Sequence, residues 1–123
     1  MTRHLYSPYM SQMLDRFHKD YDKRIDCDPG WYDLIEKIDV ELRVIDPEYT
    51  IYQIKEKFGA LRFYFDTEEP PETRTYMQEI VSAYELISKR VCEITGTEGI
   101  LMKKGSQMKT LNPLYAPEGF IEC

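Results

Sequence analysis

The sequence predicts an α+β fold in which helices lie on one side of an antiparallel sheet. Two β-prone runs, residues 49–56 and 60–65, flank a short turn that contains Gly59, which is the local pattern of a β-hairpin. Apolar residues recur at helical spacing both before and after this hairpin. We therefore predict two N-terminal helices, the main hairpin, a long helix and a second small β-hairpin, in that order.

Composition and charge indicate one packed domain without a membrane segment. The chain has 123 residues and a formal net charge of −6, which disfavours general nucleic-acid binding because that affinity comes mainly from Lys and Arg. No apolar run approaches the ~20 residues that span a bilayer, and the N-terminus lacks the pattern of a secretory signal. The three cysteines have no close spacing. We expect a cytoplasmic protein with reduced thiols.

The first two helices are predicted from their start and stop signals. Ser7-Pro8 combines a serine N-cap with proline at the first helical position, and apolar spacing continues the helix to residue 21 or 23. The second helix follows Asp28-Pro29-Gly30 and ends before Asp46-Pro47, since a residue before proline avoids the helical region. Trp31, in its first turn, either anchors the core or stacks on a ligand.

The third helix is predicted over residues 73–92, and its apolar stripe is the natural cover for the main hairpin. A coiled-coil dimer seam is the alternative use of that stripe, and a homo-oligomer stays possible. Glycines then punctuate residues 100–103 and 107–111, which predicts the second hairpin. The apolar residues of the tail indicate that it docks on the body or binds another subunit.

The main hairpin is predicted to have two chemically different faces, because side chains alternate along a strand. The expected apolar face consists of Tyr52, Ile54, Phe58, Leu61, Phe63 and Phe65. The opposite face is the candidate ligand-binding site and consists of Gln53, Lys55, Lys57, Arg62 and Tyr64, with Trp31 as a further stacking residue. Arg62 offers a planar fork and the lysines offer compact charges, which suits an anion. The alternative is a solvated surface whose cations pair with Glu56 and the acidic helices.

Sequence signals for catalysis are few, and we predict no catalytic residue and no cofactor. His4 and His18 are the only imidazole bases, and no serine lies in a Gly-x-Ser-x-Gly elbow. Gly-rich phosphate-binding loops are also missing from the sequence. Paired carboxylates are abundant, but their spacings are those of solvated helix faces and linkers.

Three motifs resemble an uncharacterised family of small bacterial and phage-encoded proteins. These are Gly30-Trp31-Tyr32-Asp33-Leu34-Ile35, the run from Gln53 to Tyr64, and Cys92-Glu93-Ile94-Thr95-Gly96 followed by Lys109-Thr110-Leu111-Asn112. The similarity covers residues 27–111, so that residues 1–26 are an N-terminal helical segment and 112–123 are a tail of the same domain. In the family the last motif looks like a zinc knuckle with paired cysteines and a later cysteine.

The resemblance implies that this chain has lost the zinc site. Thr95 and Asn112 stand where the family has cysteines, and Cys92 alone does not supply the four donors of structural zinc. We therefore expect no metal, and a second hairpin held by apolar packing or by association. The packing residues expected for it are Ile100, Met102, Met108 and Leu111.

These observations favour a non-enzymatic binding protein. Because the related genes are common in phages, we expect an accessory or counter-defence inhibitor that acts by stoichiometric binding to a host protein, with acidic surfaces steering a basic partner. The alternative is a ligand-binding module that captures an anionic nucleotide-type molecule at the main hairpin. A hydrolase of such a ligand is the third hypothesis.

Overall fold

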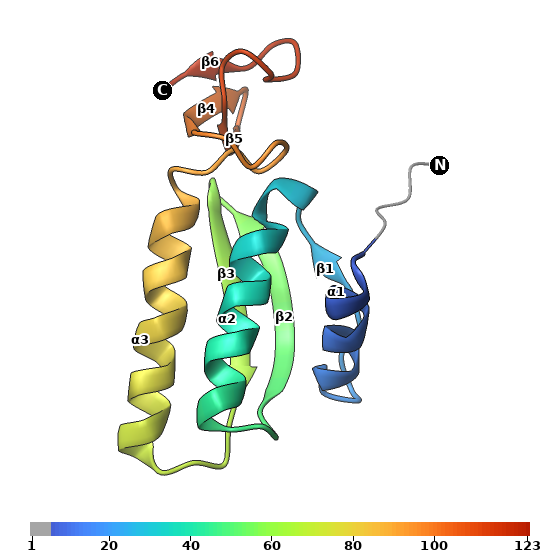
Figure 1. The fold of residues 1–123 in the computed structure, drawn as a ribbon. Coiled ribbons are helices and arrows are strands. Elements are labelled where there is room, and N and C mark those ends of the chain that lie inside the picture. The colour runs from blue at the N-terminus through green and yellow to red at the C-terminus, as the bar shows by residue number, and fades with distance from the viewer. Residues whose placement is uncertain (1–5) are drawn as a thin grey trace.

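A computed structural model describes residues 6–123, so that His4 lies outside the described part of the chain (Figure 1). The fold is α+β, as the sequence predicts, with the predicted order of main elements. The helices are α1 Pro8–Met13, a 3₁₀ turn Leu14–Arg16, a second 3₁₀ turn Pro29–Trp31, α2 Tyr32–Ile45 and α3 Pro71–Ser88. The strands are β1 Ile25–Asp26, β2 Thr50–Lys57, β3 Ala60–Asp66, β4 Ile100–Lys104, β5 Gln107–Leu111 and β6 Ile121–Glu122.

The strands form two small sheets. In the main sheet, of order β1-β2-β3, β1 is parallel to β2 and β3 is antiparallel to it. The second sheet has the order β5-β4-β6 and is antiparallel. Figure 1 shows α2 and α3 side by side against the main sheet, with the second sheet at the end of the molecule where α3 finishes. The tail docks back on the body through β6, which is one of the two outcomes expected for it.

The first helix is shorter than predicted. Ser7 caps it as expected, since its hydroxyl accepts a hydrogen bond from the backbone N–H of Met10, but the α-helix ends at Met13. Phe17 is extended and forms a parallel bridge with Ile51, and the N–H of His18 donates to the carbonyl oxygen of Ile51 at 2.8 Å. Pairing with the main sheet therefore overrides the local helical pattern beyond residue 16.

The main hairpin is confirmed, but two of its predicted core residues are not in the core. The turn residues Phe58 and Gly59 both have positive φ, 52° and 83°, which matches the right-handed twist of two paired strands. Phe58 is consequently exposed. A register shift between Ile51 and Gln53 breaks the alternation, so that Ile51 is buried and Tyr52 is displaced from the apolar face.

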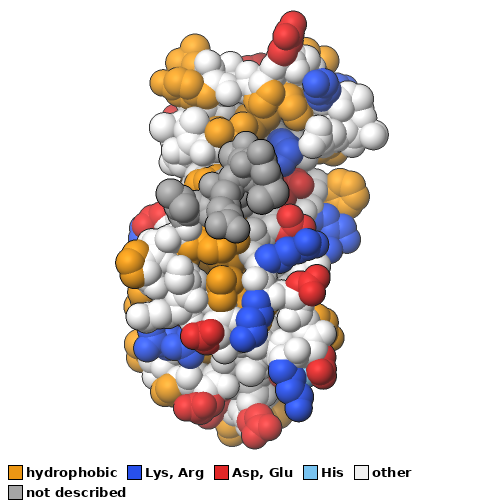
Figure 2. All heavy atoms as spheres, turned by 90° about the vertical axis from the view of Figure 1, so that its right-hand side faces the viewer, with side chains coloured by type: hydrophobic (Ala, Val, Ile, Leu, Met, Phe, Trp, Pro, Cys, Tyr) orange, Lys and Arg blue, Asp and Glu red, His pale blue; other side chains and the backbone are white. Residues whose placement is uncertain are grey.

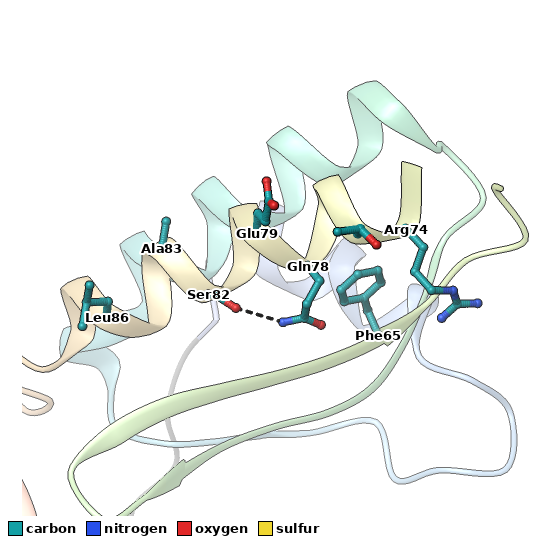
Figure 3. Close-up of a pocket in the computed structure, with 8 residues that line it drawn as sticks. Phe65, Arg74, Gln78, Glu79, Ser82, Ala83 and Leu86 are labelled. Atoms are coloured by element: carbon teal, nitrogen blue, oxygen red, sulfur yellow. Dashed lines mark hydrogen bonds between the residues drawn. The ribbon is translucent and has the colours of Figure 1, made fainter. Parts of the chain in front are cut away.

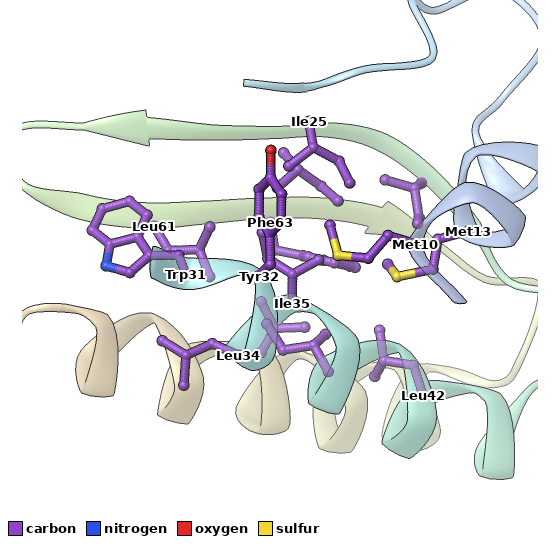
Figure 4. Close-up of a cluster of buried hydrophobic side chains, with 14 of the residues drawn as sticks. Met10, Met13, Ile25, Trp31, Tyr32, Leu34, Ile35, Leu42, Leu61 and Phe63 are labelled. Carbon is purple, nitrogen blue, oxygen red and sulfur yellow. The ribbon is translucent and has the colours of Figure 1, made fainter. Parts of the chain in front are cut away.

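The main core lies between the helices and the sheet (Figure 4). Side chains from α1, α2 and the hairpin converge there, and α3 contributes Met77 and Val81. The largest fully buried side chains are Trp31, Tyr49, Phe63, Met10, Met13, Ile35, Ile38, Leu42, Ile51, Ile54, Leu61 and Met77. Burial of this apolar surface is the main force that holds the helices on the sheet.

Helix α3 also satisfies the outer edge of the main sheet. It ends at Ser88, four residues earlier than predicted, and the Ser88 hydroxyl accepts a hydrogen bond from the backbone N–H of Leu61 at 2.9 Å. One turn earlier, a Glu85 carboxylate oxygen accepts from the N–H of Phe63, also at 2.9 Å. Two backbone donors of β3 that would otherwise face outward are therefore paired inside the chain.

A buried carboxylate fixes the N-terminal segment to α2. Asp39, which is 1% exposed, accepts hydrogen bonds from the hydroxyls of Tyr9, at 2.6 Å, and Tyr49. The guanidinium of Arg16 lies 3.2 Å from the same carboxylate. Burial, followed by the Asp39 charge and hydrogen bond, raises the pKa of Tyr49 well above its usual range, so that this hydroxyl stays a donor.

The second sheet has a small core of its own. Of the four packing residues predicted for it, Met102 and Leu111 are buried, in a cluster with Cys92, whereas Ile100 is exposed and Met108 is only half-buried. Among the described helices, none combines the length and apolar character needed to cross a bilayer.

Candidate functional site

The outer face of the main hairpin brings together five of the six predicted binding residues. Lys55 lies directly opposite Arg62 in the register, and Gln53 lies directly opposite Tyr64. Directly opposed residues share one face of a strand pair with Cβ atoms roughly 5 Å apart, and Lys57, two residues beyond Lys55, falls on the same face. Ile54, Leu61 and Phe63, which alternate with these residues, point into the core. We call the surface formed by Gln53, Lys55, Lys57, Arg62 and Tyr64 the hairpin face.

The cations of the hairpin face form no ion pair among the described residues, although Asp26 of β1 lies opposite Lys55 in the register and the Arg62 charge acts on the nearby Glu85 carboxyl. Lys55, Lys57 and Arg62 form no ion pair within residues 6–123, so the predicted alternative of pairing with Glu56 is wrong. The Glu56 carboxylate instead accepts a hydrogen bond from the Gly59 N–H at 2.7 Å. Aromatic rings lie beside the lysines: the Lys55 Nζ is 6.0 Å from the Tyr64 ring centroid, and the Lys57 Nζ is 5.8 Å from that of the exposed Phe58.

Arg62 also lines a cavity beside the hairpin face. This cavity has a volume of about 410 Å³, and its lining includes Phe58, Leu86 and Lys89 as well as Arg62. Glu85 lines it too; burial raises the pKa of the Glu85 carboxyl, although the Phe63 N–H and the Arg62 charge oppose that shift. Two cations, an aromatic ring and an aliphatic side chain therefore border one opening at the tip of the hairpin.

A second cavity lies along α3, outside the predicted site, and its lining includes Phe65 of β3 and Gln78, Glu79, Ala83 and Leu86 of α3. It measures about 570 Å³ and shares Ser82 and Leu86 with the first cavity. Figure 3 shows Gln78 and Ser82 pointing toward the strand, where the Gln78 amide donates to the Ser82 hydroxyl at 3.2 Å, while Phe65 lies at the far end. Sequence periodicity alone cannot identify this cavity, because it depends on which side of α3 packs against β3.

The opposite end of the main sheet is acidic. A cavity of about 580 Å³ is lined by His18 and the carboxylates Asp46, Glu48, Asp66, Glu68 and Glu69. Two of these carboxylates already have strong partners, since Arg74 lies 2.5 Å from Asp66 and the Thr67 hydroxyl donates to Asp46 at 2.5 Å. The hydrogen bond from Arg74 is the main reason that the Asp66 pKa lies below its usual value. Figure 2 views the molecule from the side of α1 and β1. On this side, charges of both signs are interspersed over the part of the molecule that contains the main sheet, and hydrophobic side chains gather over the second sheet.

Trp31 does not belong to the hairpin face, so its predicted role as a stacking residue is wrong. Its side chain is fully buried in the main core, on the helix side of the sheet, and its indole N–H donates to the carbonyl oxygen of Val91 at 2.8 Å. The core-anchoring alternative describes it correctly. An indole in this position links the start of α2 to the segment that follows α3.

The motif segments meet at the junction between the two sheets. The N–H of Gly30 donates to the Glu93 carbonyl oxygen at 2.7 Å, and the Thr110 hydroxyl donates to the Gly59 carbonyl oxygen at 2.6 Å. The buried Glu93 carboxylate pairs with Lys109 at 2.9 Å and accepts from a backbone N–H of Asp28 at 3.0 Å. Residues from all three motifs that carry the family resemblance therefore meet by hydrogen bonding at this junction, through Gly30, Gly59, Glu93, Lys109 and Thr110.

Thr95 and Asn112, which stand where the resembled family has cysteines, are not zinc ligands. The described residues contain no cluster of three or more His, Cys, Asp or Glu side chains that could hold a metal. Hydrogen bonds connect the positions instead: the Thr95 and Thr97 hydroxyl oxygens are 2.7 Å apart, and the Asn112 amide donates to Thr97 at 3.2 Å. Burial opposes ionisation of the Cys92 thiol, but hydrogen bonds from Thr95 and neighbouring backbone groups outweigh it and lower its pKa.

Comparison of the chain with protein-family models, with curated proteins and with solved structures finds no match.

Proposed function

We propose that this protein is a non-enzymatic binding protein and that the hairpin face contacts an acidic surface of a partner protein in a stoichiometric complex. The observation that carries the proposal is that Lys55, Lys57 and Arg62 share one face of the strand pair and form no ion pair within residues 6–123. Positive charge held in this way attracts an acidic surface and speeds association.

The composition of the hairpin face supports a protein partner. Arg and Tyr, represented by Arg62 and Tyr64, are over-represented among the residues that dominate binding energy in protein complexes. The exposed Phe58 at the hairpin tip adds apolar area next to Lys57. The resemblance to small phage and bacterial proteins makes a host protein the partner that we propose, with the role of an accessory or counter-defence factor in the cytoplasm.

A second candidate function is capture of an anionic nucleotide. It is favoured by one specific observation, the 410 Å³ cavity whose lining includes Arg62, Lys89 and Phe58 together with Glu85. Cations of this kind bind phosphate, and an exposed aromatic ring can stack on a base.

Charge reversal separates these proposals. The tagged protein and the variants Lys55→Glu and Arg62→Glu are used to capture partners from a bacterial lysate, with Lys103→Glu on β4 as the matched control, because Lys103 is exposed and lies outside the hairpin face. We expect one partner to be retained by the wild type and the control and lost with either hairpin variant, with weaker capture as salt rises.

Capture that survives both hairpin variants but is lost with Glu68→Lys and Glu69→Lys would contradict the proposal and assign binding to the acidic end.

A panel of nucleotides tested by thermal shift distinguishes the second candidate. A rise in melting temperature that Arg62→Ala abolishes, with the variant still folded, would favour nucleotide capture over a protein partner.

A further inference from the structure

The solvent-facing side of α3 carries a stripe that no other described element covers. Its residues recur at spacings of four and three along the helix and are all exposed: Glu72, Tyr76, Glu79, Ala83, Leu86 and Arg90, the last just beyond the end of α3. They lie opposite the positions that face the core, Met77, Val81 and Ser88. Figure 1 shows α3 at the edge of the molecule with no element beyond its outer side.

Two large apolar side chains of this stripe remain in water. Tyr76 is 57% exposed and Leu86 is 67% exposed, one near each end of the helix. Glu79 and Ala83 lie between these two residues in the sequence, and Figure 3 shows them projecting away from β3, while Gln78 and Ser82 point toward it. The stripe therefore has an apolar residue toward each end and a small side chain near its middle.

The charges at the two ends of the stripe are opposite in sign. Glu72 lies in the first turn of α3 and Arg90 lies two residues after its last turn, and neither forms an ion pair within residues 6–123. Reversing the direction of the helix therefore exchanges the positions of the acidic and basic ends. A surface with this property is complementary to itself about a two-fold axis.

We propose that two copies of the chain associate through this α3 stripe, with the two α3 helices antiparallel. A two-fold axis at the level of Val81 places Glu72 opposite Arg90 of the second copy. The same axis places Tyr76 opposite Leu86 and Glu79 opposite Ala83, where the small side chain suits helix axes about 8–10 Å apart. Each contact occurs twice, so that two ion pairs and two Tyr–Leu contacts enclose the centre.

The size of the stripe sets the expected affinity. Helix α3 has 18 residues and is therefore about 27 Å long, which gives a contact at the small end of specific interfaces. We expect a dissociation constant on the order of 10 μM. The contact uses no residue of the hairpin face, although Leu86 also lines the 410 Å³ cavity of the second candidate function.

Sedimentation equilibrium over about 1–500 μM protein tests the proposal, a range that brackets the expected constant. The wild-type mass should rise from 14.7 kDa toward twice that value. Leu86→Glu should stay monomeric throughout, with Tyr76→Glu as a second variant if Leu86→Glu does not fold. Val44→Glu is the matched control, because Val44 is 82% exposed on α2, outside the stripe, and it should dimerise like the wild type.

A charge exchange tests the register. Glu72→Arg and Arg90→Glu should each raise the dissociation constant at least about 5-fold, because each replaces two ion pairs with two like-charge contacts. The double variant Glu72→Arg/Arg90→Glu should restore the wild-type value. A wild type that remains at 14.7 kDa up to the highest concentration, an equal loss with Val44→Glu, or a failure of the double variant to recover would each overturn the proposal.

Discussion

Replacing Lys109 with methionine tests the ion pair at the junction of the two sheets. The Glu93 side chain is 2% exposed and its carboxylate lies 2.9 Å from the Lys109 ammonium, so Lys109→Met leaves a buried carboxylate without its cation. Removing one partner of a buried pair costs about 3–5 kcal/mol of unfolding free energy. We expect the lower end, about 3 kcal/mol, because the Asp28 N–H still donates to this carboxylate.

The loss should depend on pH in a defined direction. Burial already raises the Glu93 pKa above its ordinary value of 4.5, and losing Lys109 raises it further. At pH values between the unfolded-state pKa and the raised folded-state pKa, the folded chain keeps the Glu93 proton while the unfolded chain has released it. The folded state therefore loses stability as the pH rises through this interval. The variant should therefore recover part of its stability when the pH falls from about 7 to about 5.

Urea unfolding followed by Trp31 fluorescence measures this effect, since the indole is fully buried and bonds to the segment that precedes Glu93. With a slope of about 1.5–2 kcal/mol per molar, the pH 7 midpoint should fall by about 1.5–2 M. Lys103→Met is the control, because Lys103 is exposed and unpaired within residues 6–123. A loss below about 1 kcal/mol at pH 7, or an equal loss at both pH values, would refute this account of the junction.

Two further substitutions test how the elements are joined. Gly30→Ala should lower the unfolding free energy measured in urea by more than about 2 kcal/mol. The reason is that the added Cβ would meet the Cys92 and Glu93 carbonyl oxygens at 2.2 and 2.4 Å. An unfolding midpoint equal to that of the wild type would contradict this contact. Ser88→Ala should lower the unfolding free energy by about 1–3 kcal/mol. It should also speed hydrogen exchange of the Leu61 amide, because this amide loses its acceptor. Unchanged exchange would show that this bond does not protect the edge of β3.

The sequence predicts elements well where local chemistry and tertiary packing agree. Turn residues and strand propensity specify the main hairpin, and Asp46-Pro47 ends α2 where expected. The first helix is overestimated because Phe17 pairs with Ile51, a contact between segments far apart in the chain. Strands β1 and β6, with two residues each, are too short for any periodic pattern to indicate them.

The candidate site was predictable only where local strand alternation determines which side chains share a face. Strand alternation identifies the hairpin face because Gln53 to Lys57 lie beyond the register shift, whereas Tyr52 lies at the shift and was misplaced. The cavity along α3 depends on the rotation of that helix against β3, which sequence does not encode locally. Trp31 shows the remaining limit, since an aromatic residue in a first helical turn fits a core or a binding surface until its neighbours are known.

The bridge between Phe17 and Ile51, together with the parallel pairing of β1 with β2, has a consequence for the order of folding. Closing the Phe58-Gly59 turn joins residues that are near in sequence, whereas docking the N-terminal segment closes a loop of roughly 30 residues and costs more chain entropy. During synthesis on the ribosome, the apolar residues Met10, Met13 and Phe17 therefore emerge before the hairpin and remain uncovered until the hairpin has left the exit tunnel. This early segment is where a nascent chain is expected to need protection by a chaperone.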